Sequence, residues 1–523
     1  MKSDVISTMF KKDTGFGQII DESVSSQADH TALVADGVRL TYGEFGEKVK
    51  RLAAALERDG VKPGEPIAIV SRNCAEYLII EFALFKIGAV SVKINWRFSS
   101  TEIQNLLELN NVRLAFVRCE CSTLAEEILE KNRGRDIRFI SMRPNERGVS
   151  PFDEYMQNAP AAEDFHEKPI DLDWPLLRIH TSGTTGKPKC VVHTHRDFMD
   201  EIKSSIAAIG YSSGWIYQMI SQMFHVSCIG AYMVLATGGT LILLSRFDKK
   251  TYLESIEHEK VTAIGVLPVV LKSLLDDPLL NDYDIGSIRH INYSTCPMPP
   301  ALLKEAISRF GDDCNFCQSY GMTEMASIVT VLSPEDHRID GGIHLGSVGR
   351  PIPGVKVCIE DENGNVCAPG CIGEILLKGP GQMRGYYNCP EEVNESVLKG
   401  GWYHSKDMGY LDENGYLYVC GRKDDLIISG GENIYPKEIV DVMMRLTDDV
   451  EEVAVYGVPD PVWGEHVKAS VVLRKESTMT VDELKAYCRK NIAHYKAPKE
   501  IELLSSLPKS ATGKVNISKL KAH

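Results

Sequence analysis

The chain has 523 residues, of which 43% are hydrophobic and 25% charged, and its formal net charge is −14. These fractions are typical of a globular protein and exclude a disordered chain, while the acidic balance argues against a nucleic-acid-binding protein. Because single hydrophobic cores stop growing near roughly 250–300 residues, we expect more than one domain. Fourteen irregularly spaced cysteines favour a reducing compartment, and residues 1–17 contain no apolar segment of signal-peptide length. We therefore predict a cytoplasmic protein.

Helices and buried strands alternate through the first part of the chain. A capping box beginning at Thr41 is followed by apolar residues at helical spacing, so a helix is expected there. A short apolar strand at 67–70 and a helical pattern at 77–87 come next, and a second capping box begins at Ser99. This alternation predicts parallel sheets with helices packed on their faces.

A loop of hydroxyls, glycines and lysines follows a predicted strand at 176–179: Thr181-Ser182-Gly183-Thr184-Thr185-Gly186-Lys187-Pro188-Lys189. Glycines let the backbone approach an anion, hydroxyls and N–H groups donate to its oxygens, and the two lysines add positive charge. We expect this loop to bind a polyphosphate, with an ordinary surface loop as the alternative. A Walker-type loop is excluded, because only Thr184 and Thr185 separate Gly183 from Gly186 and that motif needs four intervening residues.

The stretch 226–244 contains no charged residue and approaches the roughly 20-residue length of a membrane span. Gly238-Gly239-Thr240 interrupts this stretch, which favours a buried helix at 228–236, a glycine turn and a buried strand at 241–244. We therefore predict no transmembrane segment.

The run Gly210-Tyr211-Ser212-Ser213-Gly214 matches the nucleophile elbow of α/β-hydrolases in its residue types. That elbow requires a strand before the serine and a helix after it. Here a helical pattern at 198–209 precedes the run and a predicted strand at 215–220 follows it. A serine hydrolase that uses Ser212 is therefore only a distant alternative.

A second polar run, Gln318-Ser319-Tyr320-Gly321-Met322-Thr323-Glu324, is predicted to form one short turn. Tyr320 can stack on a base, Thr323 can donate to a phosphate, and Glu324 can hold a Mg²⁺ that bridges phosphate oxygens. Taken alone, a core tyrosine beside a helix cap is the alternative interpretation of this run.

The pattern changes at about 347–420, where Pro-Gly and Asn-Gly turns separate short β-rich runs. Such spacing predicts a small β-barrel or meander. Beyond this region the elements become mixed again, with a predicted helix at 436–446, strands at 453–456 and 467–473, and a capped helix after Thr480. We place a domain boundary near Asp424.

Three further runs follow in order: Gly401-Trp402-Tyr403-His404-Ser405-Lys406-Asp407, Gly421-Arg422-Lys423-Asp424-Asp425, and Leu507-Pro508-Lys509-Ser510-Ala511-Thr512-Gly513-Lys514. With the two polar runs above, they resemble the ordered motifs of the adenylate-forming superfamily of acyl-CoA synthetases, nonribosomal adenylation domains and luciferases. The resemblance covers nearly the whole chain. It implies an α/β fold with a large N-terminal domain (1–422) of two helix-flanked sheets plus a distorted β-barrel (about 347–420). A small mobile α+β C-terminal domain (423–523) would follow, with its hinge at Asp424.

The resemblance also implies a two-step reaction that uses ATP, Mg²⁺ and CoA. A carboxylate attacks the α-phosphate of ATP to give acyl-AMP and pyrophosphate, and the CoA thiol then takes the acyl group. Carboxylate and triphosphate repel each other, so the enzyme must supply positioning and electrostatic stabilisation. We predict an AMP-forming acid–CoA ligase. A ligase that loads a separate carrier protein is the alternative acceptor class, and a homodimer is compatible with the sequence.

Nucleotide contacts are assigned by the same resemblance. The departing pyrophosphate is expected to be cradled by Thr181, Ser182, Gly183, Thr184, Thr185, Gly186 and Lys189. The adenosine contacts are expected from Ser294, Thr295, Cys296, Ser319, Tyr320, Gly321, Asp407 and Arg422. Among these, Tyr320 would stack against adenine, and Asp407 would accept from the ribose hydroxyls with Arg422 as its partner.

Lys514 is implied to be the catalytic lysine that bridges the attacking carboxylate oxygen and the phosphate. Its alternative is a solvated lysine near a chain end. By the same resemblance, Thr323 contacts phosphate and Glu324 binds Mg²⁺. A second orientation of the C-terminal domain would present Gly430 and Gly431 as the lining of the pantetheine channel.

The acid is predicted from the segment after the phosphate loop. His225 stands where the family has an aromatic residue or histidine facing the substrate carboxylate, whereas amino-acid-activating members carry an aspartate there; a structural histidine is the alternative. An apolar pocket is expected from Val226, Cys228, Ile229, Gly230, Met233 and 265–268. We predict a medium-chain, aryl or other mostly apolar acid. Cys190, Ser294-Thr295-Cys296 and Lys406 depart from the usual glycine-rich motifs.

Overall fold

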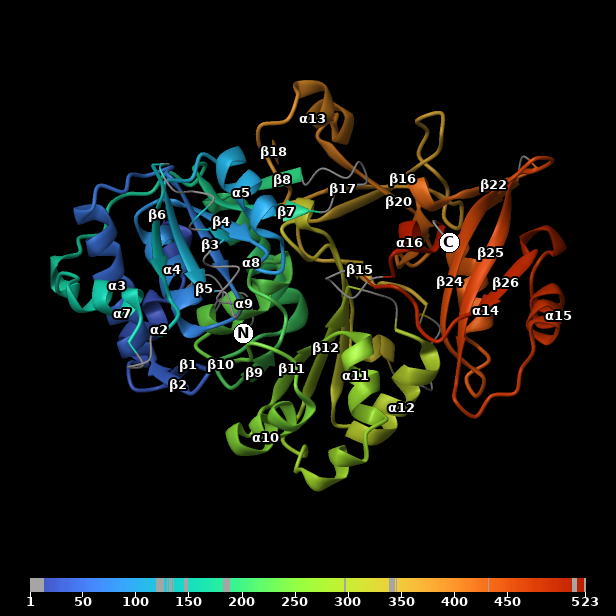
Figure 1. Ribbon diagram of the computed structural model, residues 1–523, viewed down its shortest axis with the longest axis horizontal. Helices are drawn as coiled ribbons and strands as arrows, with labels where there is room; N and C mark the ends of the chain where they lie inside the picture. Colours follow the sequence, from blue (N-terminus) through green and yellow to red (C-terminus); the bar gives the residue numbers. More distant parts are fainter. Residues whose placement is uncertain are drawn as a thin grey trace.

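Four β-sheets organise the described part of the chain (Figure 1). The computed structural model describes residues 14–118, 127–128, 130, 134, 136–144, 149–181, 189–295, 298–337, 344, 346–430, 432–509 and 515–521. The first sheet has seven strands in the order β18-β8-β7-β4-β3-β5-β6. Their bounds are β3 (Pro66–Ser71), β4 (Val90–Ile94), β5 (Leu114–Arg118), β6 (Arg138–Ser141), β7 (Pro175–Thr181), β8 (Lys189–Thr194) and β18 (Gly385–Tyr386). The strands from β7 to β6 run parallel, as predicted.

The second sheet has nine strands in the order β15-β14-β13-β12-β11-β9-β10-β1-β2. Their bounds are β1 (Thr31–Ala35), β2 (Val38–Thr41), β9 (Ile216–Met219), β10 (Thr240–Leu243), β11 (Ala263–Val266), β12 (His290–Ser294), β13 (Asn315–Tyr320), β14 (Thr330–Leu332) and β15 (Arg350–Pro351). The strands from β13 to β1 are parallel, so their carboxyl ends lie along one edge. Ligands of open parallel sheets bind at that edge.

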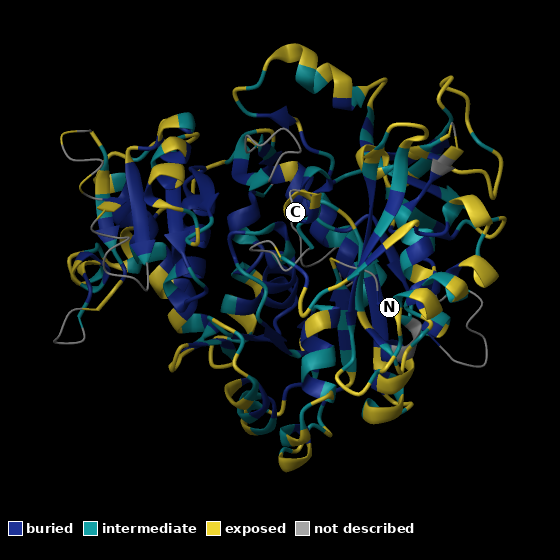
Figure 2. Cartoon of the chain, turned by 45° about the vertical axis from the view of Figure 1, so that its right-hand side comes forward, coloured by how far each residue is buried: buried dark blue, intermediate teal, exposed yellow. Residues whose placement is uncertain are grey.

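Two helices that are buried on nearly every side lie between these two sheets. They are α4 (Ala75–Lys86) and α9 (Ile229–Ala236), whose residues share one core with both sheets. α9 contains no charged residue, and a helix that is apolar all round requires such a site, whereas α4 also buries Glu81 and Lys86. In Figure 2 the buried residues, drawn dark blue, gather on the inner strands and helices, and the exposed residues lie mostly on outer helices and loops. The flanking helices are α2 (Asp21–Ser26), α3 (Tyr42–Arg58), α5 (Ser100–Leu109), α7 (Pro151–Gln157), α8 (His195–Ile209), α10 (Lys249–Glu259), α11 (Pro268–Leu275) and α12 (Pro300–Phe310).

The region predicted to be barrel-like forms one antiparallel sheet. Its order is β16-β17-β20-β19, and β21 pairs with β20. The bounds are β16 (Lys356–Glu360), β17 (Gly373–Lys378), β19 (Leu398–Lys399), β20 (Trp402–Leu411) and β21 (Leu417–Arg422), with α13 (Glu391–Val397) before β19. In Figure 1 the labelled strands β17 and β20 lie above β12 and β15 of the second sheet and to the left of β24 and β25.

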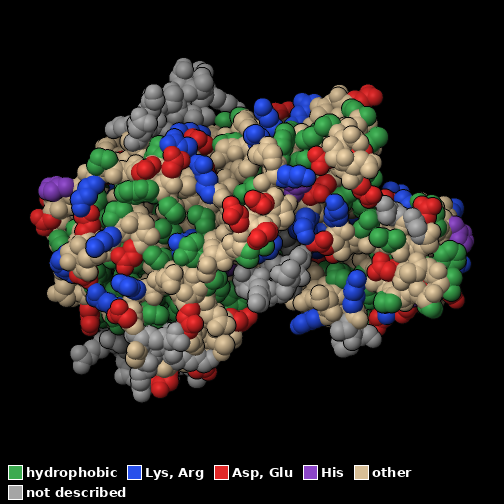
Figure 3. Space-filling model, turned by 90° about the horizontal axis from the view of Figure 1, so that it is seen from above, with side chains coloured by type: hydrophobic (Ala, Val, Ile, Leu, Met, Phe, Trp, Pro, Cys, Tyr) green, Lys and Arg blue, Asp and Glu red, His purple; other side chains and the backbone are tan. Residues whose placement is uncertain are grey.

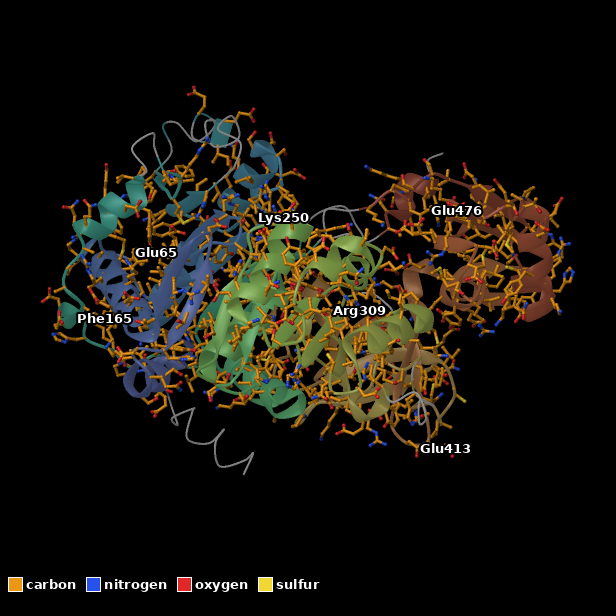
Figure 4. The ribbon with its side chains drawn as sticks, turned by 90° about the horizontal axis from the view of Figure 1, so that it is seen from below. Glu65, Phe165, Lys250, Arg309, Glu413 and Glu476 are labelled. Atoms are coloured by element: carbon orange, nitrogen blue, oxygen red, sulfur yellow. The ribbon has the colours of Figure 1, made fainter. Side chains whose placement is uncertain are left out.

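The fourth sheet contains only strands that follow residue 425. Its members are β22 (Ile427–Ser429), β23 (Glu432–Ile434), β24 (Val450–Asp460), β25 (Gly464–Leu473) and β26 (Glu500–Leu503). Its helices are α14 (Pro436–Met443), α15 (Val481–Asn491) and α16 (Ile517–Lys521). In Figure 4 the labelled Glu476 marks this unit, to one side of the labelled Arg309 on α12. Sheet membership thus changes between β21 and β22, at the place proposed for the hinge.

Local signals for helix starts are confirmed. Thr41, Ser99 and Thr480 each accept a hydrogen bond from the residue three positions on, and the reciprocal glutamate bond is present in each case. The uncharged stretch forms α9, a glycine turn and β10, as predicted. Within the described ranges, no helix combines the length and the apolarity that crossing a membrane requires.

One prediction needs correction. The run from Gln318 to Glu324 is not a single turn, because Gln318, Ser319 and Tyr320 are the last residues of β13 and a 3-10 turn begins only at Thr323. Pairing with β12 on one side and β14 on the other extends the strand through Tyr320. The polar residue types suggested a loop, but the ladder bonds on both sides keep them in the sheet.

Candidate active site

Several of the predicted nucleotide residues meet at the carboxyl edge of the second sheet. Ser294 ends β12 and Ser319 stands next to it in register on β13. Thr295 continues from β12 with φ +80°, in the left-handed region. Cys296 lies outside the described residues. The two strand ends therefore present a row of hydroxyls at the edge where ligands of parallel sheets bind.

Tyr320, Asp407 and Arg422 form one cluster. The Tyr320 hydroxyl donates to Asp407 Oδ2 at 2.6 Å, and Arg422 Nε lies 3.6 Å from Asp407 Oδ1. Asp407 and Arg422 are register partners on β20 and β21. Burial, and then the Asp407 carboxylate, raise the pKa of Tyr320 well above its usual value, so the phenol stays a neutral donor. The Asp407 carboxylate thus joins the second and third sheets, and its oxygens can also accept hydrogen bonds from the hydroxyl groups of a ligand.

Replacing Asp407 by asparagine is expected to raise the KM for ATP at least about tenfold, because a hydrogen bond to a charged acceptor contributes roughly 1.5–3 kcal/mol. The asparagine side chain keeps the shape of the aspartate and one acceptor oxygen, so the KM for the acid should stay unchanged. Steady-state kinetics with each substrate varied separately measures both values. An unaltered KM for ATP would contradict the assignment of Asp407 to the nucleotide.

The turn that carries Thr323 and Glu324 is held from three sides. His193 Nε2 lies 2.6 Å from the Thr323 carbonyl oxygen, and burial lowers the pKa of His193 to about 4, so the neutral ring donates this bond. The Met383 amide donates to the Glu324 carbonyl at 2.8 Å. The Tyr386 hydroxyl donates to Glu324 Oε1 at 2.9 Å. This bracing fixes the direction of the Glu324 carboxylate.

Gly321 is required where β13 turns into this segment. A Cβ atom at Gly321 would lie 1.5 Å from the Ser327 carbonyl oxygen. The segment returns through Ala326 and Ser327, which both have positive φ, and the next amide, of Ile328, donates to Glu201 Oε1 at 3.1 Å. No side chain other than hydrogen fits at Gly321 without moving this backbone.

The phosphate-type loop leaves and re-enters the first sheet on adjacent strands. Thr181 ends β7, Lys189 begins β8, and the two are register partners. Lys189 Nζ lies 4.7 Å from the centroid of the Tyr386 ring, the same tyrosine that binds Glu324. Residues Ser182, Gly183, Thr184, Thr185 and Gly186 lie outside the described part of the chain. Tyr386 therefore connects the loop's base to the Glu324 turn, a role that no motif predicted.

His225 closes a turn after β9. Its amide donates to the Gln222 carbonyl at 3.0 Å, and its Nδ1 accepts from the Ser227 amide at 3.4 Å. The ring is half-buried at the start of the segment that leads into α9. The predicted apolar residues Val226, Cys228 and Ile229 are buried directly after it.

A buried tyrosine fills the space behind this segment. A Cβ atom added at Gly265 on β11 would lie 2.1 Å from Tyr217 Oη, and one added at Gly230 on α9 would lie 2.9 Å from it. The Tyr217 ring packs edge-on against Tyr211, with 5.6 Å between the ring centroids, and burial raises the pKa of Tyr217 to about 12. The two glycines predicted to line the apolar pocket therefore have a phenol between them. The sequence predicts that Tyr217 lies on a strand, but it does not show that this side chain enters the space between Gly230 and Gly265.

Lys406 adds a charge beside the Asp407 cluster. Its backbone has φ +61°, and its Nζ lies 3.5 Å from Asp424 Oδ2. The left-handed conformation explains why glycine is usual at this position of the family motif. This ion pair links β20, the strand that carries Asp407, to the proposed hinge residue Asp424.

Replacing Lys406 by glycine is expected to change the free energy of unfolding by less than about 1 kcal/mol. The relieved backbone strain offsets the loss of an ion pair whose side chains are 44% and 40% exposed, since exposed pairs contribute about 0–1 kcal/mol. Urea denaturation measures this change. A loss larger than about 2 kcal/mol would show that the pair is a structural requirement.

Of the two glycines proposed to line the pantetheine channel, the structure describes Gly430. Its φ is +61°, its amide donates to the Trp463 carbonyl at 2.8 Å, and a Cβ atom there would lie 2.6 Å from Trp463 Cε3. Close packing of Trp463 is therefore one reason for this glycine. Gly431 and Lys514 lie outside the described residues.

The hydrolase alternative lacks its structural context. Ser212 follows α8, whose end is capped by Gly210 with φ +91°, and precedes β9. A helix–turn–strand arrangement is the reverse of a nucleophile elbow. Ser212 is exposed at this turn.

Comparison with known proteins agrees with this arrangement. The family models described as AMP-binding enzyme and AMP-binding enzyme C-terminal domain match residues 20–387 and 440–514. A feruloyl-CoA synthase of Amycolatopsis sp is 34% identical over 93% of this chain and 94% of the relative. A fatty acid–[acyl-carrier-protein] ligase of Streptomyces coeruleorubidus is 30% identical over 95% of both chains. The o-succinylbenzoate CoA synthetase of Bacillus subtilis, solved with its acyl-adenylate intermediate, has a TM-score of 0.82 at 32% identity, covering 96% of this chain and 98% of that one. The chain belongs to the AMP-binding enzyme family and is an AMP-forming acid–thiol ligase of the adenylate-forming superfamily.

Proposed function

We propose that this ligase joins a compact aryl or similarly apolar carboxylic acid to CoA through an acyl-AMP intermediate. The observation that carries the proposal is the Tyr320–Asp407–Arg422 cluster at the edge of the second sheet, next to the braced Glu324 turn. Hydroxyl-binding and cation-binding groups therefore stand side by side, as a Mg²⁺–nucleotide substrate requires.

The nucleotide residues receive the following roles in this proposal. Asp407 accepts from the ribose hydroxyls, and Tyr320 offers its ring to adenine. The Thr181–Lys189 loop and Thr323 hold the phosphates, and the hydroxyls of Ser294, Thr295 and Ser319 border the site. Glu324 suits Mg²⁺, because a carboxylate oxygen is a ligand type that this ion prefers and Tyr386 fixes its orientation. When bound, Mg²⁺ neutralises charge on the phosphate oxygens.

The acyl group is proposed to be compact because Tyr217 occupies the interval between Gly230 and Gly265. His225 would face the carboxylate, and the apolar residues after it would surround the rest of the acid. A flat ring fits such a short pocket better than an extended alkyl chain. The names of two relatives, a feruloyl-CoA synthase and an indoleacetate–CoA ligase at 34% and 32% identity, support an aryl acid.

Lys514 is proposed to bridge the attacking carboxylate and the α-phosphate during adenylation. The domain boundary at 422/423 and the hinge at Asp424 are proposals supported by the change of sheet between β21 and β22. Rotation there would replace Lys514 by the Gly430–Gly431 loop for the attack of the thiol on the acyl carbonyl, with AMP as the leaving group.

A separate carrier protein is the second candidate acceptor, favoured by the fatty acid–[acyl-carrier-protein] ligase among the relatives.

We also propose a cytoplasmic location for the protein. A homodimer is proposed as well, and light scattering would test this oligomeric state. No nucleic-acid partner is proposed, because acidic and basic side chains are interspersed on the face seen in Figure 3, and the described part of that face shows no continuous basic stripe.

The test is a thioester assay with ATP, Mg²⁺ and CoA across benzoate, cinnamate, octanoate, palmitate and the common amino acids. We expect AMP, pyrophosphate and acyl-CoA in equal amounts, with the highest kcat/KM for an aryl acid. Activation of amino acids alone would contradict the role of His225. Activity with a carrier protein and none with CoA would favour the second acceptor.

A further inference from the structure

A lysine–glutamate pair is completely buried between the two large sheets. Lys93 on β4 and Glu81 on α4 lie 2.5 Å apart, nitrogen to oxygen, and both side chains are 0% exposed. The family resemblance assigns no role to either residue. Removing two charges from water is so costly that a buried pair rarely adds net stability compared with apolar residues. The Lys93–Glu81 pair is therefore expected to have a role other than stabilising the fold.

Every hydrogen-bonding group of the pair is satisfied. Glu81 Oε1 also accepts from Ser91 Oγ at 2.9 Å, and Glu81 Oε2 accepts from the Tyr232 hydroxyl at 2.5 Å. Lys93 Nζ donates to the Tyr232 hydroxyl at 3.0 Å and to the Met223 carbonyl at 2.9 Å. Its three N–H groups thus have three acceptors, one of which is a backbone atom in another part of the chain.

That backbone atom belongs to the turn that ends at His225. Met223 lies inside the turn closed by the bond from the His225 amide to the Gln222 carbonyl. Its amide donates to Asn73 Oδ1 at 2.8 Å, while its carbonyl accepts from Lys93. Asn73 also donates to the Ser221 carbonyl at 3.0 Å. The peptide groups on either side of Met223 are therefore oriented by side chains from the first sheet and its neighbouring loop.

We propose that Lys93 is a positioning residue for the acid: neutralised by Glu81, it holds the Met223 carbonyl and so fixes the turn that presents His225. This inference rests on the proposed function, because it takes His225 to face the substrate carboxylate. Lys93 and Glu81 touch no substrate atom in this account. Their effect reaches the acid only through the 222–225 turn.

The test uses the double variant Lys93→Met/Glu81→Gln, which leaves no unpaired buried charge. Its free energy of unfolding should fall by no more than about 1–3 kcal/mol, the cost of leaving the Met223 carbonyl without its donor, because the amide that replaces the Glu81 carboxylate keeps an oxygen that can accept from Ser91 or Tyr232. Its KM for the acid should rise about tenfold, the scale of one lost hydrogen bond, while the KM for ATP changes less than about twofold. In a His225→Ala background the same double change should have no further effect on the KM for the acid.

A matched control is Lys86→Met, on the same helix as Glu81. Lys86 is also buried and bonds Asp21 Oδ1 at 2.8 Å and Glu167 Oε1 at 2.6 Å, and both of these partners lie outside the 222–225 turn. Its loss should lower stability and leave the KM for the acid unchanged. If the Lys93→Met/Glu81→Gln protein does not fold, Asn73→Ala gives the second test, since Asn73 holds the same turn and should produce the same selective rise.

Amide hydrogen exchange measures how well the 222–225 turn is held when no substrate is present. Protection of the Met223 amide should fall in Lys93→Met/Glu81→Gln and stay unchanged in Lys86→Met. A double variant with wild-type stability, wild-type exchange at Met223 and an unaltered KM for the acid would overturn the proposal. The expected loss of protection in a protein that activates no acid would instead contradict the proposed function and leave the positioning of the turn supported.

Discussion

Replacing Lys514 by alanine is expected to lower the rate of acyl-AMP formation at least about a hundredfold, the scale of removing one preorganised charge at a reacting centre. The lysine is assigned to the step in which two anions approach each other, so ATP binding should change little. Conversion of synthetic acyl-AMP to the thioester should also be nearly unaffected. Pyrophosphate release in a single turnover measures the first step, and thioester formation from acyl-AMP measures the second.

Lys509→Ala is the matched control, because it removes a lysine from the same C-terminal segment. Lys509 forms an ion pair with Glu452 on the surface of the C-terminal unit. Its loss should change adenylation less than about twofold, as expected for an exposed pair. Equal losses in the two variants would indicate that the segment, and not the Lys514 ammonium, is what adenylation requires.

Replacing Tyr217 by alanine is expected to raise the kcat/KM for octanoate relative to benzoate at least about tenfold. The change empties the interval between Gly230 and Gly265, and each additional buried methylene contributes about 0.8 kcal/mol. The measurement is kcat/KM for a series of linear and aryl acids with both proteins.

Tyr217→Phe separates the ring from its hydroxyl. It keeps the ring between Gly230 and Gly265 and removes only the hydroxyl, so the preference between octanoate and benzoate should stay as in the unsubstituted protein. If Tyr217→Ala folds normally and retains the original preference, Tyr217 does not border the acyl pocket.

Local signals predicted the regular elements well and their ends less well. The capping boxes at Thr41 and Ser99 located two helix starts, because a cap depends only on residues three positions apart. The strand predicted at 453–456 runs from Val450 to Asp460, since pairing with β25 continues beyond its apolar centre. Cross-strand pairing is a long-range property that an apolar run does not encode.

The residues of the candidate site also fall into two groups, those that sequence motifs reveal and those that only the structure reveals. Tyr320, Asp407 and Arg422 stand in recognisable motifs, and the structure brings them together. Tyr386 and the Lys93–Glu81 pair belong to no such motif. Their contacts join residues that are far apart in sequence, such as Tyr386 with Glu324 and Lys93 with Met223. Only the packing of one sheet against another shows which polar side chains are buried together.

The central claim is that this ligase joins acid and nucleotide into a mixed anhydride before any thiol reacts. The most direct measurement mixes the purified protein with a preferred aryl acid, Mg²⁺ and ATP labelled at the α-phosphate, without CoA, and separates the quenched products. We predict labelled acyl-AMP in an amount close to that of the enzyme, converted to labelled AMP when CoA is added. Labelled ADP, or thioester formation without any labelled anhydride, would contradict the account.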